Sequence, residues 1–152
     1  MRSCPRSRRI PGAHLVNVSS VFGIFAPAGQ AAYSASKFAV RGFSEAVRHE
    51  LAEDGVGVTV VHPGGIKTRI AESARTGSGV SVEEYEQGRK QFAKLLRMPP
   101  EAAAAQIVAA IEKRTPRLLI GASAKIPDVL VRLMPGSYWK LIARRAGRPA
   151  ER

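Results

Sequence analysis

Residues 30–51, QAAYSASKFAVRGFSEAVRHEL, decide the fold because they carry a long helical pattern with polar residues on one side. Apolar residues recur in this stretch at spacings of three and four, which predicts an amphipathic helix with one apolar stripe facing a core. The stripe consists of Val40, Phe43, Val47 and Leu51. Asp54-Gly55 follows, a pair that ends a helix readily.

The first turn of this predicted helix carries Tyr33 and Lys37, four residues apart. In a helix this spacing places both side chains on one face, so an ammonium lies beside a phenol. A nearby cation stabilises a phenolate, which is the form of a tyrosine that accepts a proton. The pair therefore indicates proton transfer, while a solvated helix face with no chemical role is the alternative.

Two predicted strands flank the helix. Residues 14–20, HLVNVSS, form a mostly apolar run that ends at Ser20, and residues 56–61 form a second, β-branched run. The second run enters a Pro63-Gly64-Gly65 turn, in which proline stiffens the backbone and glycine allows close approach. Strand, helix and strand joined by short turns predict a right-handed crossover of a parallel sheet. Open sheets of this kind bind ligands at the carboxyl ends of their strands.

The order of these motifs resembles the short-chain dehydrogenase/reductase family over residues 15–70: a strand ending in Ser20, a Tyr-x-x-x-Lys helix, and a strand entering a Pro-Gly turn with a threonine. The resemblance implies an oxidoreductase that interconverts a carbonyl and an alcohol, with NAD or NADP as cofactor. It implies a catalytic triad of Ser20, Tyr33 and Lys37. The cofactor-binding residues that it implies are Tyr33, Lys37, Pro63, Gly64, Ile66 and Thr68.

The loop of residues 21–29, VFGIFAPAG, lies between the first strand and the helix. Its position at the carboxyl end of a parallel strand makes Phe22 and Phe25, together with Ser20, candidates for binding a small-molecule substrate. The alternative is that the two rings only pack the loop. Downstream, a charged helix is expected over residues 81–97, where the family builds its substrate lid.

The fold class predicted for the whole chain is α/β. A proline-led helix over residues 101–114 and a strand over residues 117–120 complete about three strands of a partial doubly wound, Rossmann-like parallel sheet. The family's nucleotide-binding half carries a Thr-Gly-x-x-x-Gly-x-Gly turn, which this sequence lacks. The chain is therefore expected to be a partial gene product, inactive alone, with an unpaired sheet edge at its first strand.

Three segments are predicted: a disordered basic stub at 1–12, the catalytic half of the domain at 13–123 and a basic amphipathic tail at 124–152. The tail reads as two short helices split by Pro135-Gly136. Its apolar residues either pack on the body and over the active site or lie in a membrane surface. In the family the helix of residues 33–51 helps to form a dimer, so a homo-oligomer is expected; a non-catalytic module that pairs with a full-length relative is the alternative.

Composition narrows the other function classes. The net charge is +12 over 152 residues, yet the excess of basic residues gathers at the two ends of the sequence. No known nucleic-acid-binding motif is found that would place these residues against DNA or RNA. Nucleic-acid binding is therefore not predicted. The single cysteine, Cys4, favours a reducing compartment and a cytoplasmic location, and no metal site is predicted.

Overall fold

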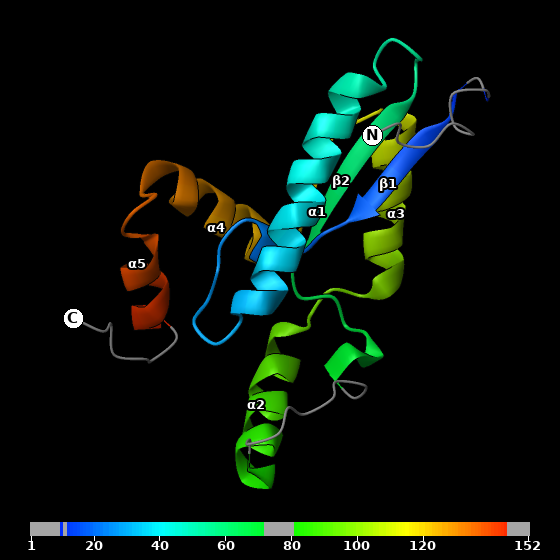
Figure 1. Cartoon of the computed structure of the whole chain (residues 1–152). Coiled ribbons are helices and arrows are strands. Elements are labelled where there is room, and N and C mark those ends of the chain that lie inside the picture. Colours follow the sequence, from blue (N-terminus) through cyan, green and yellow to red (C-terminus); the bar gives the residue numbers. More distant parts are fainter. Residues whose placement is uncertain (1–9, 11, 72–80, 146–152) are drawn as a thin grey trace.

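The computed structural model describes residues 10, 12–71 and 81–145 (Figure 1). Most of the predicted stub and the segment 72–80 lie outside the described residues. In chain order the elements are β1 (His14–Val18), the 3-10 turn η2 (Val21–Gly23), α1 (Ala31–Glu50), β2 (Gly57–Pro63), the 3-10 turn η3 (Arg69–Ala71), α2 (Val82–Leu95), α3 (Pro100–Glu112), β3 (Arg117–Ile120), α4 (Ala122–Leu133) and α5 (Tyr138–Arg145).

The three strands form one parallel sheet in the order β1-β2-β3. Val16 of β1 lies opposite Thr59 of β2, and Val61 of β2 lies opposite Leu118 of β3. Because β2 is central, β1 is an edge strand among the described residues, as the sequence predicted. The predicted α/β class and parallel topology are confirmed.

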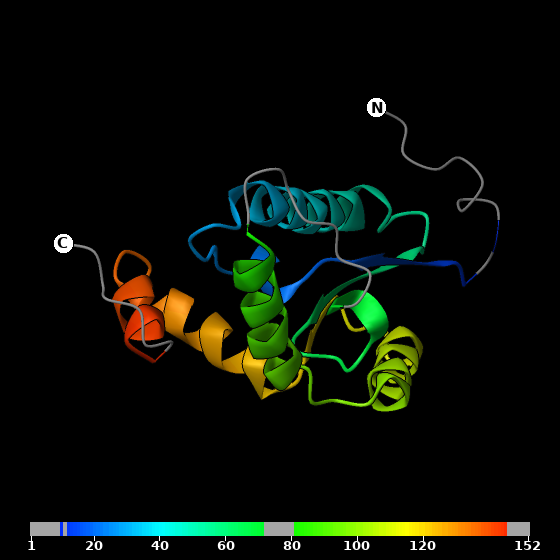
Figure 2. The ribbon, with the colours of Figure 1, turned by 90° about the horizontal axis from the view of Figure 1, so that it is seen from below.

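Helices cover both faces of the sheet, with α1 on one side and α3 on the other (Figure 2). Alternate residues of β2 point to opposite faces, so each helix packs against its own apolar cluster. The cluster under α1 contains Val47, Leu51, Val56 and Val58. The cluster that includes residues of α3 contains Val61, Ala103 and Ile120. The sheet is thus the middle layer of a three-layer sandwich.

Element boundaries agree closely with the sequence predictions, with two corrections. β1 ends at Val18, two residues early, because Ser20 leaves the ladder to begin η2. Phe43 does not face the core: its side chain is 53% exposed, and α1 buries Ser34, Ser44 and Val47 instead. Phe43 lies at the border of the apolar stripe, so the helix rotates it away from the sheet.

The predicted pair of helices in the tail is confirmed as α4 and α5, separated by residues 134–137. α4 begins at Ala122, directly after β3, and packs against that strand. An ion pair fixes it there: Asp128 accepts hydrogen bonds from Arg117 of β3 at 2.5 and 3.2 Å, and from Arg132 at 3.1 Å. α4 is therefore attached to the body through a largely buried charge pair.

Candidate active site

Ser20 lies just beyond the carboxyl end of β1, where the chain turns into η2. Its hydroxyl oxygen caps this turn by accepting the Phe22 N–H at 3.1 Å. The preceding Ser19 is buried and donates its hydroxyl to the carbonyl of Lys37 at 2.8 Å. Gly23 makes this contact possible, since a Cβ there would lie 2.4 Å from the Ser19 hydroxyl oxygen. The loop that carries Ser20 is thereby held against α1.

Tyr33 and Lys37 occupy the first turns of α1, which begin beside the same loop. The Lys37 ammonium lies 5.6 Å from the centroid of the Tyr33 ring and donates to the carbonyl of Val18, the last residue of β1, at 3.4 Å. The Tyr33 side chain is 41% exposed. The predicted pairing of phenol and ammonium is present, and both groups lie at the carboxyl end of β1.

An aromatic chain links Tyr33 to the tail. The Phe22 ring packs edge-to-face against Tyr33 at 6.0 Å and against Phe25 at 5.3 Å, and Phe25 in turn packs against Tyr138 of α5 at 6.5 Å. Phe25 is 8% exposed, so it keeps little surface for a ligand and mainly packs the loop. Phe22 is only partly buried and lies next to the tyrosine.

The predicted cofactor residues of the β2 turn are drawn together by backbone hydrogen bonds. Gly64 N–H donates to the carbonyl of Ile120 at 3.0 Å, which ties the end of β2 to β3. Ile66 N–H donates to the carbonyl of Gly64 at 3.0 Å, and Thr68 N–H donates to the carbonyl of Ile66 at 2.9 Å. Pro63 is the last residue of β2. These residues form a compact turn at the carboxyl end of β2, next to the strand that leads to Ser20.

The chain's own elements explain both glycines of this turn. A Cβ at Gly64 would lie 2.0 Å from the Ser123 hydroxyl oxygen, and one at Gly65 would lie 1.8 Å from the carbonyl oxygen of Leu95. Ser123, which the sequence did not single out, accepts the Gly65 N–H at 3.1 Å. In the sequence, Ser123 is marked only by its position shortly after β3. Its contact with the β2 turn can be predicted only if β3 is known to lie next to β2.

His62, at the end of β2, is a further residue that contacts the loop of Ser20. Its ring is fully buried, and Nδ1 lies 2.9 Å from the carbonyl oxygen of Ser20. Because a carbonyl only accepts, Nδ1 carries the proton, while Nε2 has no hydrogen-bond partner among the described residues. Burial lowers the pKa of His62, outweighing the hydrogen bond to Ser20, which raises it. A neutral imidazole therefore donates a hydrogen bond to the backbone of Ser20 and helps to hold it in place.

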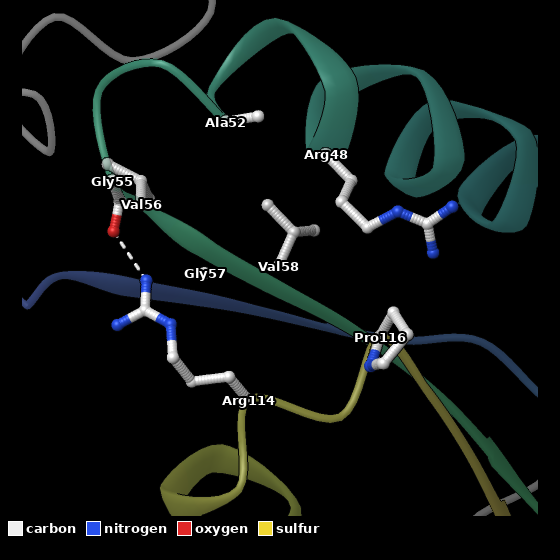
Figure 3. Close-up of a pocket in the computed structure, with 8 residues that line it drawn as sticks. All are labelled: Arg48, Ala52, Gly55, Val56, Gly57, Val58, Arg114 and Pro116. Carbon is white, nitrogen blue, oxygen red and sulfur yellow. Dashed lines mark hydrogen bonds between the residues drawn. The ribbon is translucent and has the colours of Figure 1, made fainter.

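A separate hollow of about 560 Å³ lies at the opposite end of β2, and Figure 3 shows the residues that line it. Its wall includes Arg48 of α1, the start of β2 and Arg114, whose guanidinium donates to the carbonyl of Gly55. The amino ends of parallel strands lie opposite the carboxyl ends, where Ser20 and Tyr33 are found. This hollow is therefore not the predicted active site.

Comparisons with known proteins agree with this arrangement. The family model described as short chain dehydrogenase matches residues 6–79. The chain is 47% identical over 133 residues to the "Putative oxidoreductase SadH" of Mycobacterium tuberculosis, an alignment that covers 86% of this chain and 47% of that protein. The chain belongs to the short-chain dehydrogenase/reductase family.

Solved structures of short-chain dehydrogenases share the fold. A short-chain dehydrogenase/reductase from Burkholderia phymatum, in complex with NAD, matches with a TM-score of 0.65 and 24% identity, covering 92% of this chain and 51% of that one. One from Burkholderia cenocepacia, in complex with NADP, matches with a TM-score of 0.63 and 23% identity, covering 90% and 48%. The chain thus spans about half the length of these short-chain dehydrogenases.

Two further properties concern the part of the chain that the structure describes. No helix there is long and apolar enough to cross a bilayer. Within the same residues, no three of the side chains of His, Cys, Asp or Glu gather in a way that could hold a metal ion.

Proposed function

We propose that this chain supplies the catalytic portion of an NAD(P)-dependent short-chain oxidoreductase that interconverts a carbonyl and an alcohol. The observation that carries the proposal is the placement of Tyr33, with the Lys37 ammonium 5.6 Å from its ring, beside the loop of Ser20 at the carboxyl end of β1. Family membership and the NAD and NADP complexes of the structural relatives support it.

The proposed proton transfer depends on the O–H groups of Ser20 and Tyr33 and on the charge of Lys37. The Ser20 oxygen accepts the Phe22 N–H, which leaves its own proton free to be donated to a substrate oxygen. Tyr33 transfers a proton to the same oxygen during reduction and takes it back during oxidation. The positive charge of Lys37 favours the phenolate stage of this transfer.

The residues at this edge fit the nicotinamide end of a dinucleotide. Within the part of the chain that the structure describes, the Lys37 ammonium donates one long hydrogen bond, 3.4 Å to the carbonyl of Val18, so its remaining N–H donors can bind ribose hydroxyls. The β2 turn, with Pro63, Gly64, Ile66 and Thr68, would bind the carboxamide end. When bound, the cofactor supplies or accepts the hydride at the carbonyl carbon. Phe22 would line the substrate side, and Phe25 would support its ring.

The decisive experiment grafts residues 13–121 onto SadH in place of the matching stretch and follows NADH or NADPH oxidation with a panel of aldehydes and ketones. Replacing Tyr33→Phe should lower kcat by about 10²- to 10⁴-fold, because the proton donor is removed while the ring contacts stay. Lys113→Met, at the exposed end of α3, is the control and should leave kcat unchanged. Equal turnover of the Tyr33→Phe and unchanged chimeras would refute the proposal.

The isolated chain of 152 residues is expected to show no appreciable turnover and no saturable NADH fluorescence change, because its sequence carries no glycine-rich pyrophosphate turn. Saturable binding by the isolated chain would contradict this part of the proposal.

A homo-oligomer built through α1 is also proposed. The outward face of this helix exposes Phe38, Phe43 and a row of small residues, which suits close contact between helices. The small residues are Ala35, Ala39, Gly42 and Ala46. The same face would serve a non-catalytic module that pairs with a full-length relative. A cytoplasmic location stays a prediction from the single cysteine, Cys4.

A further inference from the structure

The outer side of α4 carries an apolar stripe that no other described element covers. Ile126, Val129 and Leu133 are 50%, 53% and 75% exposed. Their spacings of three and four residues place them on one face of the helix. Met134, the residue after α4, and Leu141 of α5 are exposed as well. These five residues are called the outer apolar surface below.

Contacts on the inner side of α4 and α5 keep this surface pointing outward. Ala124 is fully buried, and Asp128 is buried in its pair with Arg117 of β3. Tyr138 of α5 packs against Phe25 in the loop of the candidate active site. Since the inner side is already occupied by the body, the stripe cannot turn inward without breaking the ion pair. Figures 1 and 2 both show α4 and α5 at one flank of the molecule and α3 at the other.

Charge around the outer apolar surface is strongly positive. Residues 122–145 contain five basic side chains and a single acid, Asp128, which is neutralised by Arg117 and Arg132. Lys125 is exposed one helical turn from Val129, and Lys140 is exposed next to Leu141. An exposed apolar surface rimmed with cations is complementary to an anionic lipid surface, in which apolar side chains enter the interface and ammonium groups meet phosphates.

We infer that α4 and α5 dock the protein on membranes that contain anionic phospholipids. The contact is peripheral: α4 has 12 residues, contains Pro127 and is too short to span a bilayer. A second copy of the chain is a poorer occupant, because it would bring Lys125 and Lys140 against their own counterparts. The inference is independent of the proposed catalytic function, since none of the five residues of the outer apolar surface, and neither lysine, is assigned there.

The test is sedimentation of the full chain with vesicles of phosphatidylcholine mixed with phosphatidylserine, compared with pure phosphatidylcholine. Binding is expected to the mixed vesicles and to be much weaker with the neutral ones. The double variant Val129→Glu/Leu133→Glu should bind the mixed vesicles at least about tenfold more weakly, because charges replace the inserted side chains. Val108→Glu is the matched control, since Val108 is 54% exposed on α3 at the other flank, and should bind like the unchanged chain.

A second pair of variants tests the charges. Lys125→Gln/Lys140→Gln should weaken binding to the mixed vesicles by roughly tenfold, and Lys90→Gln/Lys113→Gln, of the same net charge, should not. Trp139, the only tryptophan of the chain, lies in α5, and its emission should shift to the blue when mixed vesicles are added.

Several outcomes would overturn the inference. If the Val129→Glu/Leu133→Glu protein sediments like the unchanged chain while its circular dichroism is preserved, binding comes only from the net charge of the protein. Loss of a concentration-dependent dimer in the same variant, without any vesicle binding by the unchanged chain, would assign the surface to a second copy instead. Absence of sedimentation of the unchanged chain with mixed vesicles would also reject it.

Discussion

At the scale of the residue, the carbonyl of Ser20 shows how hydrogen bonds hold the loop that carries a candidate site residue. It accepts the N–H of Gly23 at 3.0 Å and the Nδ1–H of His62 at 2.9 Å. These two bonds fix the backbone from which the Ser20 hydroxyl projects. Because the His62 ring is fully buried and no described residue bonds to Nε2, protonation would place a charge in the core.

His62 therefore predicts a pH dependence of stability. Burial lowers its pKa in the folded chain, whereas an unfolded histidine titrates near about 6.5. Below that pH the unfolded chain binds the proton first, so the free energy of unfolding should fall as pH decreases from about 6.5 toward the lower folded pKa. Urea denaturation at several pH values measures this, and His62→Gln should flatten the slope.

Two points complete the design of that experiment. The pKa of His14 is also lowered, by burial and by the charge of Arg114, but His14 is present in both proteins and its contribution cancels. Val108→Gln, at an exposed position of α3, changes no titratable group; it is the control and should keep the slope of the unchanged chain. An unchanged slope in His62→Gln would mean that the buried imidazole is not the titrating group.

At the scale of the element, α4 depends on one carboxylate. Burial raises the pKa of Asp128, but the hydrogen bonds and charges of Arg117 and Arg132 outweigh this and hold the pKa below its usual value. The stability that Asp128 contributes is thus present above about pH 3.8 and is lost as pH falls through the folded pKa. The side chain of Arg117 is itself mostly buried, so it needs this partner.

Replacing Asp128→Asn should lower the free energy of unfolding by about 3 kcal/mol, since it leaves the Arg117 charge buried without a counterion. Thermal denaturation followed by circular dichroism measures the change. Glu86→Gln, which breaks the exposed pairs with Arg89 at 3.6 Å and Lys90 at 3.9 Å on α2, is the control and should cost less than about 0.5 kcal/mol. Equal losses in the two variants would show that the Arg117 pair is no more important than a surface one.

At the scale of the whole molecule, two surfaces besides the outer apolar surface are uncovered among the described residues: the edge of β1 and the outward face of α1. The edge strand offers unpaired backbone groups, and α1 offers Phe38 and Phe43 among small residues. Both features suit contact with another polypeptide chain. They also make self-association of the chain in solution an expected property.

The α1 face gives the prediction for assembly. Phe43→Asp should weaken self-association by about tenfold or more, because it places a charge at the centre of the helix contact. Light scattering coupled to size-exclusion chromatography measures the mass, and Val108→Asp on α3 is the control with similar exposure. If Phe43→Asp keeps the mass of the unchanged chain, the contact must be sought at the β1 edge.

The local pattern of the sequence determined most of the elements. Apolar spacing fixed the helix that became α1, β-branched runs fixed the strands, and a Tyr-x-x-x-Lys spacing placed Tyr33 and Lys37 on one helix face. These features depend on periods of two and 3.6 residues, so neighbours in sequence are enough to reveal them. The proposed roles of Ser20, Tyr33 and Lys37 are still predictions.

Only the tertiary structure decided which distant groups meet. The hydrogen bond from His62 to Ser20 spans 42 residues and that from Gly65 to Ser123 spans 58. Neither can be recognised from the spacing of apolar residues within one helix or strand. The same holds for the exposure of Phe43, which depends on how α1 is rotated over the sheet. Packing of whole elements sets these contacts, because the free energy of burial depends on what lies opposite a side chain rather than beside it in the chain.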